Sequence, residues 1–129
     1  MVLQVYLKMQ KINTYRDLIV WQKSIELAKT IYDNCKSFPE DEKFGLVIQI
    51  KRAAVSIPSN IAEGYARNTT KDYLRFLIIA LGSAYEVQTQ VLLSRELGFE
   101  KIEKQFDKSM LLLEEIIKML SSLRKKLTP

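Results

Sequence analysis

The chain has 129 residues, which is the length of one domain and too short for two. Its 47% hydrophobic and 27% charged residues are ordinary for a globular protein and exclude intrinsic disorder. Only 4 glycines and 3 prolines are present, which favours a few long elements. The net charge of +5 allows two interpretations, general solubility or attraction to polyanions such as nucleic acid.

Sequence signals for secretion and for membranes are missing. The single cysteine, Cys35, cannot close an internal disulfide. The N-terminal residues lack the apolar stretch of a signal peptide. No unbroken apolar run approaches the ~20 residues that span a bilayer. We therefore expect a cytoplasmic protein that does not associate with a membrane.

The first predicted helix runs from about Tyr15 to Lys36. Its apolar residues recur three and four positions apart, which predicts one buried stripe with further apolar residues beside it. The stripe comprises Leu18, Trp21, Ile25, Ala28, Tyr32 and Cys35, and the flank comprises Val20, Leu27 and Ile31. Residues 1–13 are expected to form an N-terminal arm, extended or with a short strand, beside a domain of residues 14–129.

The second predicted helix begins near Pro39, because proline suits a first helical turn. Its core stripe is Leu46, Ile50, Ala53, Ile57 and Ile61. Pro58 falls inside this pattern, and we expect it to kink the helix without ending it. Gly64 is the expected end of the helix.

The third helix is expected to begin at a Thr69 or Thr70 cap and to reach about Leu97, with Gly98 in a left-handed conformation after it. The fourth helix follows directly in this interpretation. Its seam comprises Phe99, Ile102, Phe106, Ser109, Leu113, Ile116, Leu120, Leu123 and Leu127. Short loops join antiparallel neighbours, so the sequence predicts an all-α, up-down-up-down antiparallel four-helix bundle.

The chain has no histidine, which excludes Ser-His and Cys-His nucleophile pairs and the Glu-x-x-His metal sites of helical bundles. No glycine-rich phosphate loop is present either. Cys35 lies on an apolar stripe and is expected to be buried and unreactive. We therefore predict no catalytic residues, no metal and no cofactor.

Two predicted helices carry more apolar surface than one buried face requires. Ile48 and Val55 point away from the core stripe of the second helix, and Ile79 lies near the polar strip of the third. Aligned exposed hydrophobic residues indicate a protein interface, so we predict that Ile48, Val55 and Ile79 contribute to a homo-oligomer. The alternative is a monomer with a thick core.

Basic residues are the remaining functional signal. Lys51 and Arg52 lie in the second helix, and Arg67, Lys71 and Arg75 cluster around the start of the third. These five are the candidate nucleic-acid-binding residues. The alternative for each is an ordinary solvated surface charge, and Arg52 has a further alternative, an ion pair across a subunit interface.

Three segments resemble a known family. They are KRAAVSIPSNIAEGY from Lys51 to Tyr65, YRDLIVWQK from Tyr15 to Lys23, and ALGSAYE from Ala80 to Glu86. Together they resemble the four-helix-bundle proteins encoded by intervening sequences in bacterial 23S ribosomal RNA genes, over roughly Tyr15 to Leu123. The resemblance implies a ring-like homopentamer and provides no catalytic residues. Arg52 matches a basic position of the family.

The chain is also similar to the accessory variability protein of diversity-generating retroelements, which binds a reverse transcriptase and nucleic acid through a basic surface. The sequence therefore predicts a non-catalytic, oligomeric nucleic-acid-binding protein, with RNA favoured over DNA. The alternative is an adaptor that docks a protein partner such as a reverse transcriptase.

Overall fold

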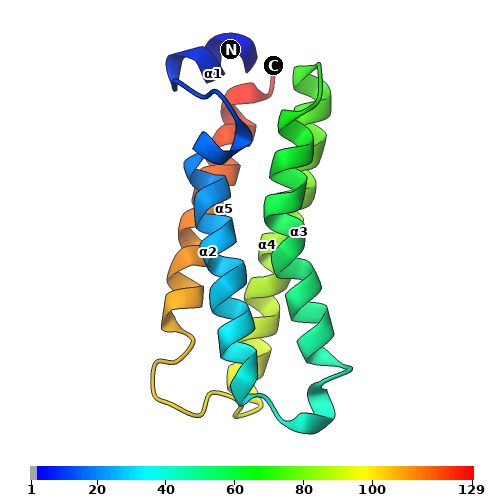
Figure 1. Cartoon of the computed structure of the whole chain (residues 1–129), viewed down its shortest axis with the longest axis vertical. Helices are drawn as coiled ribbons and strands as arrows, with labels where there is room; N and C mark the ends of the chain where they lie inside the picture. The colour runs from blue at the N-terminus through cyan, green and yellow to red at the C-terminus, as the bar shows by residue number, and fades with distance from the viewer. Residues whose placement is uncertain (1–2) are drawn as a thin grey trace.

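The computed structural model describes residues 3–129, and over this range the chain is all-α without a strand. Its helices are α1 (Leu3–Met9), α2 (Ile19–Asn34), α3 (Leu46–Tyr65), α4 (Thr70–Glu96) and α5 (Asp107–Leu127). Single 3-10 turns occupy Tyr15–Asp17, Cys35–Ser37 and Glu40–Glu42. Figure 1 shows α2 and α4 descending while α3 and α5 rise, so consecutive long helices are antiparallel. Each long helix packs against two others, and α3 lies diagonally opposite α5.

The predicted core stripe of α3 is confirmed, because Leu46, Ile50, Ala53, Ile57 and Ile61 are all buried. The helix starts later than predicted, at Leu46. A 3-10 turn follows Pro39 instead, and the Glu42 carboxylate accepts a hydrogen bond from the Leu46 amide at 3.2 Å.

As predicted, α3 continues past Pro58, which is buried in its interior. A bend of this helix at Pro58 stays a prediction.

The buried face of α2 differs from the predicted one. Val20, Leu27 and Ile31, assigned to the flank, are buried, whereas Tyr32 from the predicted stripe is 47% exposed. Ser24 accounts for the error. It lies on the true core face, fully buried, and its hydroxyl donates to the Trp21 carbonyl at 2.7 Å. Because serine is polar, a search for apolar spacing leaves Ser24 out of the core stripe. The predicted buried face is therefore displaced by about one residue from the observed one.

Residues 3–9 form a helix, so the prediction of an extended arm or a strand is wrong for them. Leu3 and Leu7 are buried and join the hydrophobic core, and Tyr6 packs against it. This α1 lies across the end of the bundle where both chain termini meet (Figure 1). Residues 1 and 2 of the predicted arm lie outside the described residues.

The start of the last helix was also misplaced, since α5 begins at Asp107 and a loop precedes it. Gly98 has a φ of 78°, as predicted, and turns the chain out of α4. In the loop, the Gln105 side chain accepts from the Lys101 amide at 2.9 Å and Glu100 accepts from the Phe106 amide at 2.8 Å. These side-chain hydrogen bonds take the place of the backbone hydrogen bonds of a helix. Ile102 lies in this loop and is 71% exposed. From Phe106 onward the predicted seam is buried.

Tyr73 supports a stability prediction. Its side chain is fully buried in α4, and its hydroxyl has no hydrogen-bond partner within residues 3–129. Burial raises the pKa of this hydroxyl well above its ordinary value. An unpartnered buried hydroxyl costs about 1–3 kcal/mol, so we expect Tyr73→Phe to raise the free energy of unfolding by about 1 kcal/mol. Urea unfolding followed by circular dichroism measures this. A loss of stability would mean that the hydroxyl has a partner.

Candidate nucleic-acid interface

The turn between α3 and α4 presents three of the predicted basic residues. Thr69 caps α4 as expected, its hydroxyl accepting from the Asp72 amide at 3.1 Å. Arg67 lies in the turn, and Lys71 and Arg75 follow at i, i+4 spacing on one face of α4. All three side chains are exposed, and the turn and the start of α4 place them at the same end of the bundle.

Close approach of the two helices sets this turn. Gly64 is buried against α4, and a Cβ added to it would lie 2.8 Å from the Cβ of Phe76. Glycine at this position therefore permits a short distance between α3 and α4, which any larger residue would increase. On the outside of the same contact, the Arg67 guanidinium lies 4.6 Å from the centroid of the Phe76 ring. The two helices thus meet closely at the turn, and Arg67 forms a cation–π contact across it.

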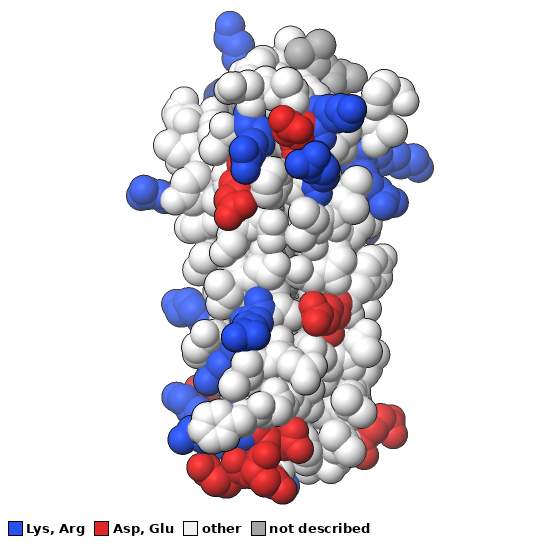
Figure 2. Space-filling view, turned by 90° about the vertical axis from the view of Figure 1, so that its right-hand side faces the viewer, with Lys and Arg blue, Asp and Glu red and all other residues white. Residues whose placement is uncertain are grey.

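The fold adds basic residues from three further segments to this end of the bundle. Antiparallel packing brings α1 and the loop after it, the 3-10 turn Tyr15–Asp17 and the end of α5 to the same end of the bundle as the α3–α4 turn (Figure 1). We call this surface the basic end. Its exposed cationic residues are Lys8, Lys11, Arg16, Arg67, Lys71, Arg75, Arg124, Lys125 and Lys126, and its carboxylates are Asp17, Glu63 and Asp72. Figure 2 shows cationic residues gathered at this end with acidic residues among them, and a cluster of acidic residues beside further cationic ones at the other end.

Among the residues that the structure describes, no cation of the basic end forms an ion pair with a carboxylate. Among residues 3–129, the ion pairs involve Lys23, Lys36, Arg95 and Lys108. None of these cations belongs to the basic end. Positive charge that is exposed, clustered and unneutralised creates a local field attractive to polyanions. Arg124, Lys125 and Lys126 lie in the last turn of α5, and only the topology of the bundle joins them to the other basic residues.

Lys51 and Arg52 do not join this surface, and the five predicted site residues do not form one cluster. At 1.5 Å rise per residue, Arg52 is about 20 Å from the α3–α4 turn along the helix axis. Lys51 is half-buried, with its ammonium 4.6 Å from the centroid of the Tyr32 ring. Arg52 is exposed beside Glu86 in a shallow groove between α3 and α4.

The predicted interface residues lie on the outside of the bundle. Val55 is 42% exposed and Ile79 is 47% exposed, while Ile48 is half-buried. Ile48 and Val55 line one groove together with Tyr32 and Lys51. Further exposed apolar side chains continue along α4, namely Ile78, Tyr85, Leu92 and Leu93. Exposed apolar side chains therefore lie along both α3 and α4, and the isolated chain leaves them uncovered.

The described residues show no catalytic features. Cys35 is buried, and burial raises the pKa of its thiol to about 11 although Lys51 opposes the shift. A thiol with such a pKa stays protonated at neutral pH and is a poor nucleophile. Residues 3–129 contain no group of three side chains able to hold a metal ion.

By length and composition, α4 could cross a membrane, although its unbroken apolar run from Phe76 to Leu81 is far shorter than a membrane span. Its apolar segment is 44% buried inside the bundle. Core helices of bundles pass the same test, because one face packs inward while another meets a partner. Composition alone therefore does not assign α4 to a bilayer.

Known proteins share this arrangement. The model of the 23S rRNA-intervening sequence protein family matches residues 16–122. The chain belongs to this family. A crystal structure of a protein with unknown function from the S23 ribosomal protein family of Bacteroides thetaiotaomicron has a TM-score of 0.75 and 30% identity. That similarity covers 83% of this chain and 99% of the other. No curated protein matches the chain.

Membership confirms the resemblance inferred from the three sequence segments. The family match begins at Arg16, so α1 lies outside the matched region and the α3–α4 turn lies inside it. Arg67, Lys71 and Arg75 therefore belong to the part that the family shares. Lys8, Lys11, Arg124, Lys125 and Lys126 lie beyond the match on either side.

Proposed function

We propose that this protein is a non-catalytic, cytoplasmic, oligomeric nucleic-acid-binding protein that contacts RNA phosphates through its basic end. The supporting observation is the separation of charge along the bundle. One end of the bundle carries nine exposed cationic residues and three carboxylates. None of the nine cationic residues forms an ion pair within residues 3–129. Phosphate contacts depend on the charge of the nucleic-acid backbone and not on the identity of the bases. The proposed binding is therefore broad and not base-specific.

The second part of the proposal is self-association through the apolar surface that includes Ile48, Val55 and Ile79. A second copy is a suitable occupant, because the exposed apolar side chains extend along both α3 and α4. Assembly into a ring, of which a pentamer is the form we propose, would repeat the basic end on every subunit. Repetition multiplies weak phosphate contacts through effective concentration. DNA is a second polyanion for the same surface, and no membrane is involved.

A protein adaptor is the alternative function, with a reverse transcriptase as one candidate partner. The observation that favours it is the groove of Ile48, Val55 and Tyr32, which combines apolar walls with Lys51 and Arg52. Aromatic, apolar and arginine side chains are typical of protein interfaces. This alternative predicts binding that persists when the basic end is neutralised.

The test is the double substitution Lys71→Ala with Arg75→Ala. Each lost phosphate contact costs about 1 kcal/mol or more at low salt, so we expect RNA affinity to fall about tenfold or further. Fluorescence anisotropy with a labelled structured RNA measures the dissociation constant. Light scattering on the same sample verifies that the oligomer is intact.

A matched control removes two cations from the opposite end of the bundle. Lys43→Ala with Lys101→Ala changes the net charge equally, and both residues are exposed. We expect this control to lower affinity by less than about threefold, because distant charges are screened within about 10 Å at 0.1 M salt. Equal losses in both double variants would mean that net charge matters and the basic end does not.

A further inference from the structure

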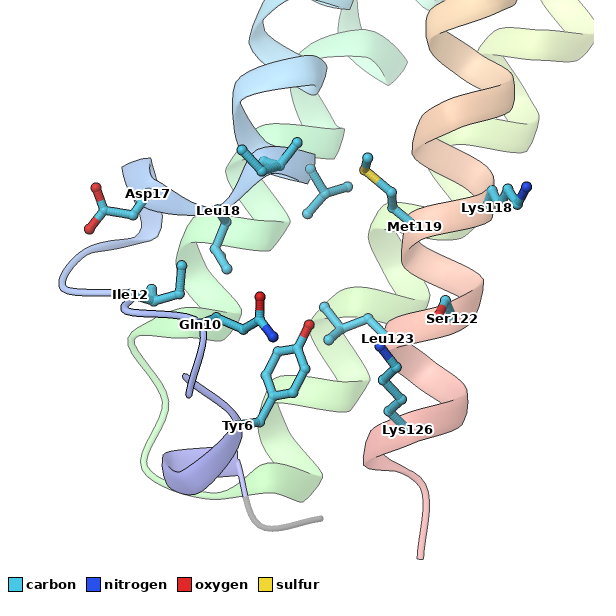
Figure 3. A pocket seen from close by; sticks show the side chains of 12 residues that line it. Tyr6, Gln10, Ile12, Asp17, Leu18, Lys118, Met119, Ser122, Leu123 and Lys126 are labelled. Carbon is cyan, nitrogen blue, oxygen red and sulfur yellow. The ribbon is translucent and has the colours of Figure 1, made fainter. Parts of the chain in front are cut away.

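A cavity opens beside the basic end, between α1 and its following loop on one side and the C-terminal half of α5 on the other (Figure 3). Its volume is about 490 Å³, within the range of pockets that hold small ligands. Leu18, Val20, Met119 and Leu123 line its apolar walls. The cavity is therefore able to enclose a flat, largely apolar group.

Polar groups inside the cavity lack intramolecular partners. The Tyr6 hydroxyl and the Gln10 amide both extend into it (Figure 3), and neither side chain forms a hydrogen bond within residues 3–129. Gln10 offers a donor and an acceptor side by side, as the edge of a nucleobase requires. The Lys126 ammonium lies 5.8 Å from the centroid of the Tyr6 ring and places a positive charge beside the aromatic surface.

Other charges at the cavity lie on its rim. Asp17 points away from the interior in Figure 3, and its carboxylate accepts from the Asn13 amide at 2.9 Å and from the Thr14 amide at 3.0 Å. Lys118 also points outward. The one charged group directed at the interior is thus the cation Lys126, which belongs to the basic end.

We propose that this cavity accepts a single unpaired nucleotide of an RNA strand whose neighbouring phosphates lie on the basic end. The proposal rests on the function proposed above and names the substrate class as single-stranded RNA. The base enters between the apolar walls and contacts the Tyr6 ring. Its edge bonds to Gln10, and Lys126 meets the adjoining phosphate. An aromatic surface combined with a positively charged path is how proteins hold unstacked bases.

Two RNAs with equal numbers of phosphates test the proposal, an unstructured single strand and a blunt duplex, both measured by fluorescence anisotropy. Charge alone favours the duplex, because its phosphates are more densely spaced. The proposal predicts the opposite order. Since a buried, stacked base contributes strongly to affinity, we expect the single strand to bind about tenfold more tightly.

Substitutions that leave the net charge unchanged then measure the contribution of the cavity to RNA binding separately from that of the basic end. Ser122 lines the cavity and is exposed, so Ser122→Trp should fill the space while Ser122→Ala leaves it open. We expect Ser122→Trp to weaken single-strand binding about tenfold and duplex binding less than about twofold. Gln10 is exposed as well, and Gln10→Ala should weaken single-strand binding about fivefold through lost hydrogen bonds. Gln49→Ala, an exposed glutamine of α3, is the matched control.

The outcomes distinguish the two proposals. If the wild-type protein binds neither RNA, the proposed function fails and this inference fails with it. If it binds both RNAs and neither Ser122→Trp nor Gln10→Ala changes the preference, only the inference is overturned. Should Ser122→Trp fail to fold by circular dichroism, Gln10→Ala still decides, because its side chain makes no internal hydrogen bond.

Discussion

Val55→Glu is expected to convert the assembled protein into monomers. Val55 is 42% exposed in the isolated chain and lines the groove with Ile48 and Tyr32. A second copy covering this groove would bury the new carboxylate, and Lys51 and Arg52 in the same groove would offset only part of the several kcal/mol that burial of a charge costs per subunit contact. Light scattering at micromolar concentration should give several times 15.0 kDa for the wild type and 15.0 kDa for the variant.

The control for this experiment is Leu111→Glu. Leu111 is 58% exposed on α5, diagonally across the bundle from α3, and receives the same change in charge. Its mass should remain that of the wild type, and circular dichroism should show unchanged helicity in both variants. A wild-type mass of 15.0 kDa, or an intact assembly in Val55→Glu, would remove Val55 from any interface.

The second large effect is a loss of stability, which we expect from Gly64→Ala. Replacing a helical glycine by alanine usually stabilises a protein, but here the new Cβ would lie 2.8 Å from the Phe76 Cβ and 3.3 Å from the Tyr73 carbonyl oxygen. Neither atom is the end of a flexible side chain, so α3 and α4 must separate. Overpacking of this kind costs about 1–3 kcal/mol, and we expect Gly64→Ala to lower the free energy of unfolding by that amount.

Gly82→Ala is the matched control in the neighbouring helix. Gly82 is exposed within α4, and no atom lies within 4 Å of its added Cβ. Alanine should therefore raise the free energy of unfolding by about 0.5–1 kcal/mol. Opposite signs for the two glycines, measured by urea unfolding, would support the close contact of α3 with α4. Stabilisation by both substitutions would contradict it.

Most of the fold follows from local patterns in the sequence. The α3 stripe from Leu46 to Ile61, the Thr69 cap and the Gly98 turn were all predictable, because apolar spacing and capping chemistry act over a few residues. Errors arose where tertiary contacts decide. Ser24 is polar yet fully buried, which misplaced the α2 face. Ile102 kept helical spacing but lies in a loop held by the side chains of Glu100 and Gln105.

The candidate site was only partly predictable for the same reason. Arg67, Lys71 and Arg75 are close in sequence, and helix geometry alone places them together. Arg124 and Lys126 reach the same surface through the antiparallel topology, which requires the whole bundle to be assembled. The cavity depends on α1, which lies in the segment that was expected to be an extended arm or a short strand. Lys51 and Arg52 were grouped with the turn on residue type alone, although helix length separates them.

Dependence of RNA binding on salt tests the central claim most directly. If the basic end contacts phosphates, the logarithm of affinity should fall linearly with the logarithm of salt concentration, because binding releases the salt cations that surround the RNA. Removing both Lys71 and Arg75 should flatten this slope by about one unit per lost contact. If wild-type affinity does not respond to salt, or if the variant keeps both affinity and slope while its oligomer remains intact, the basic end does not bind RNA.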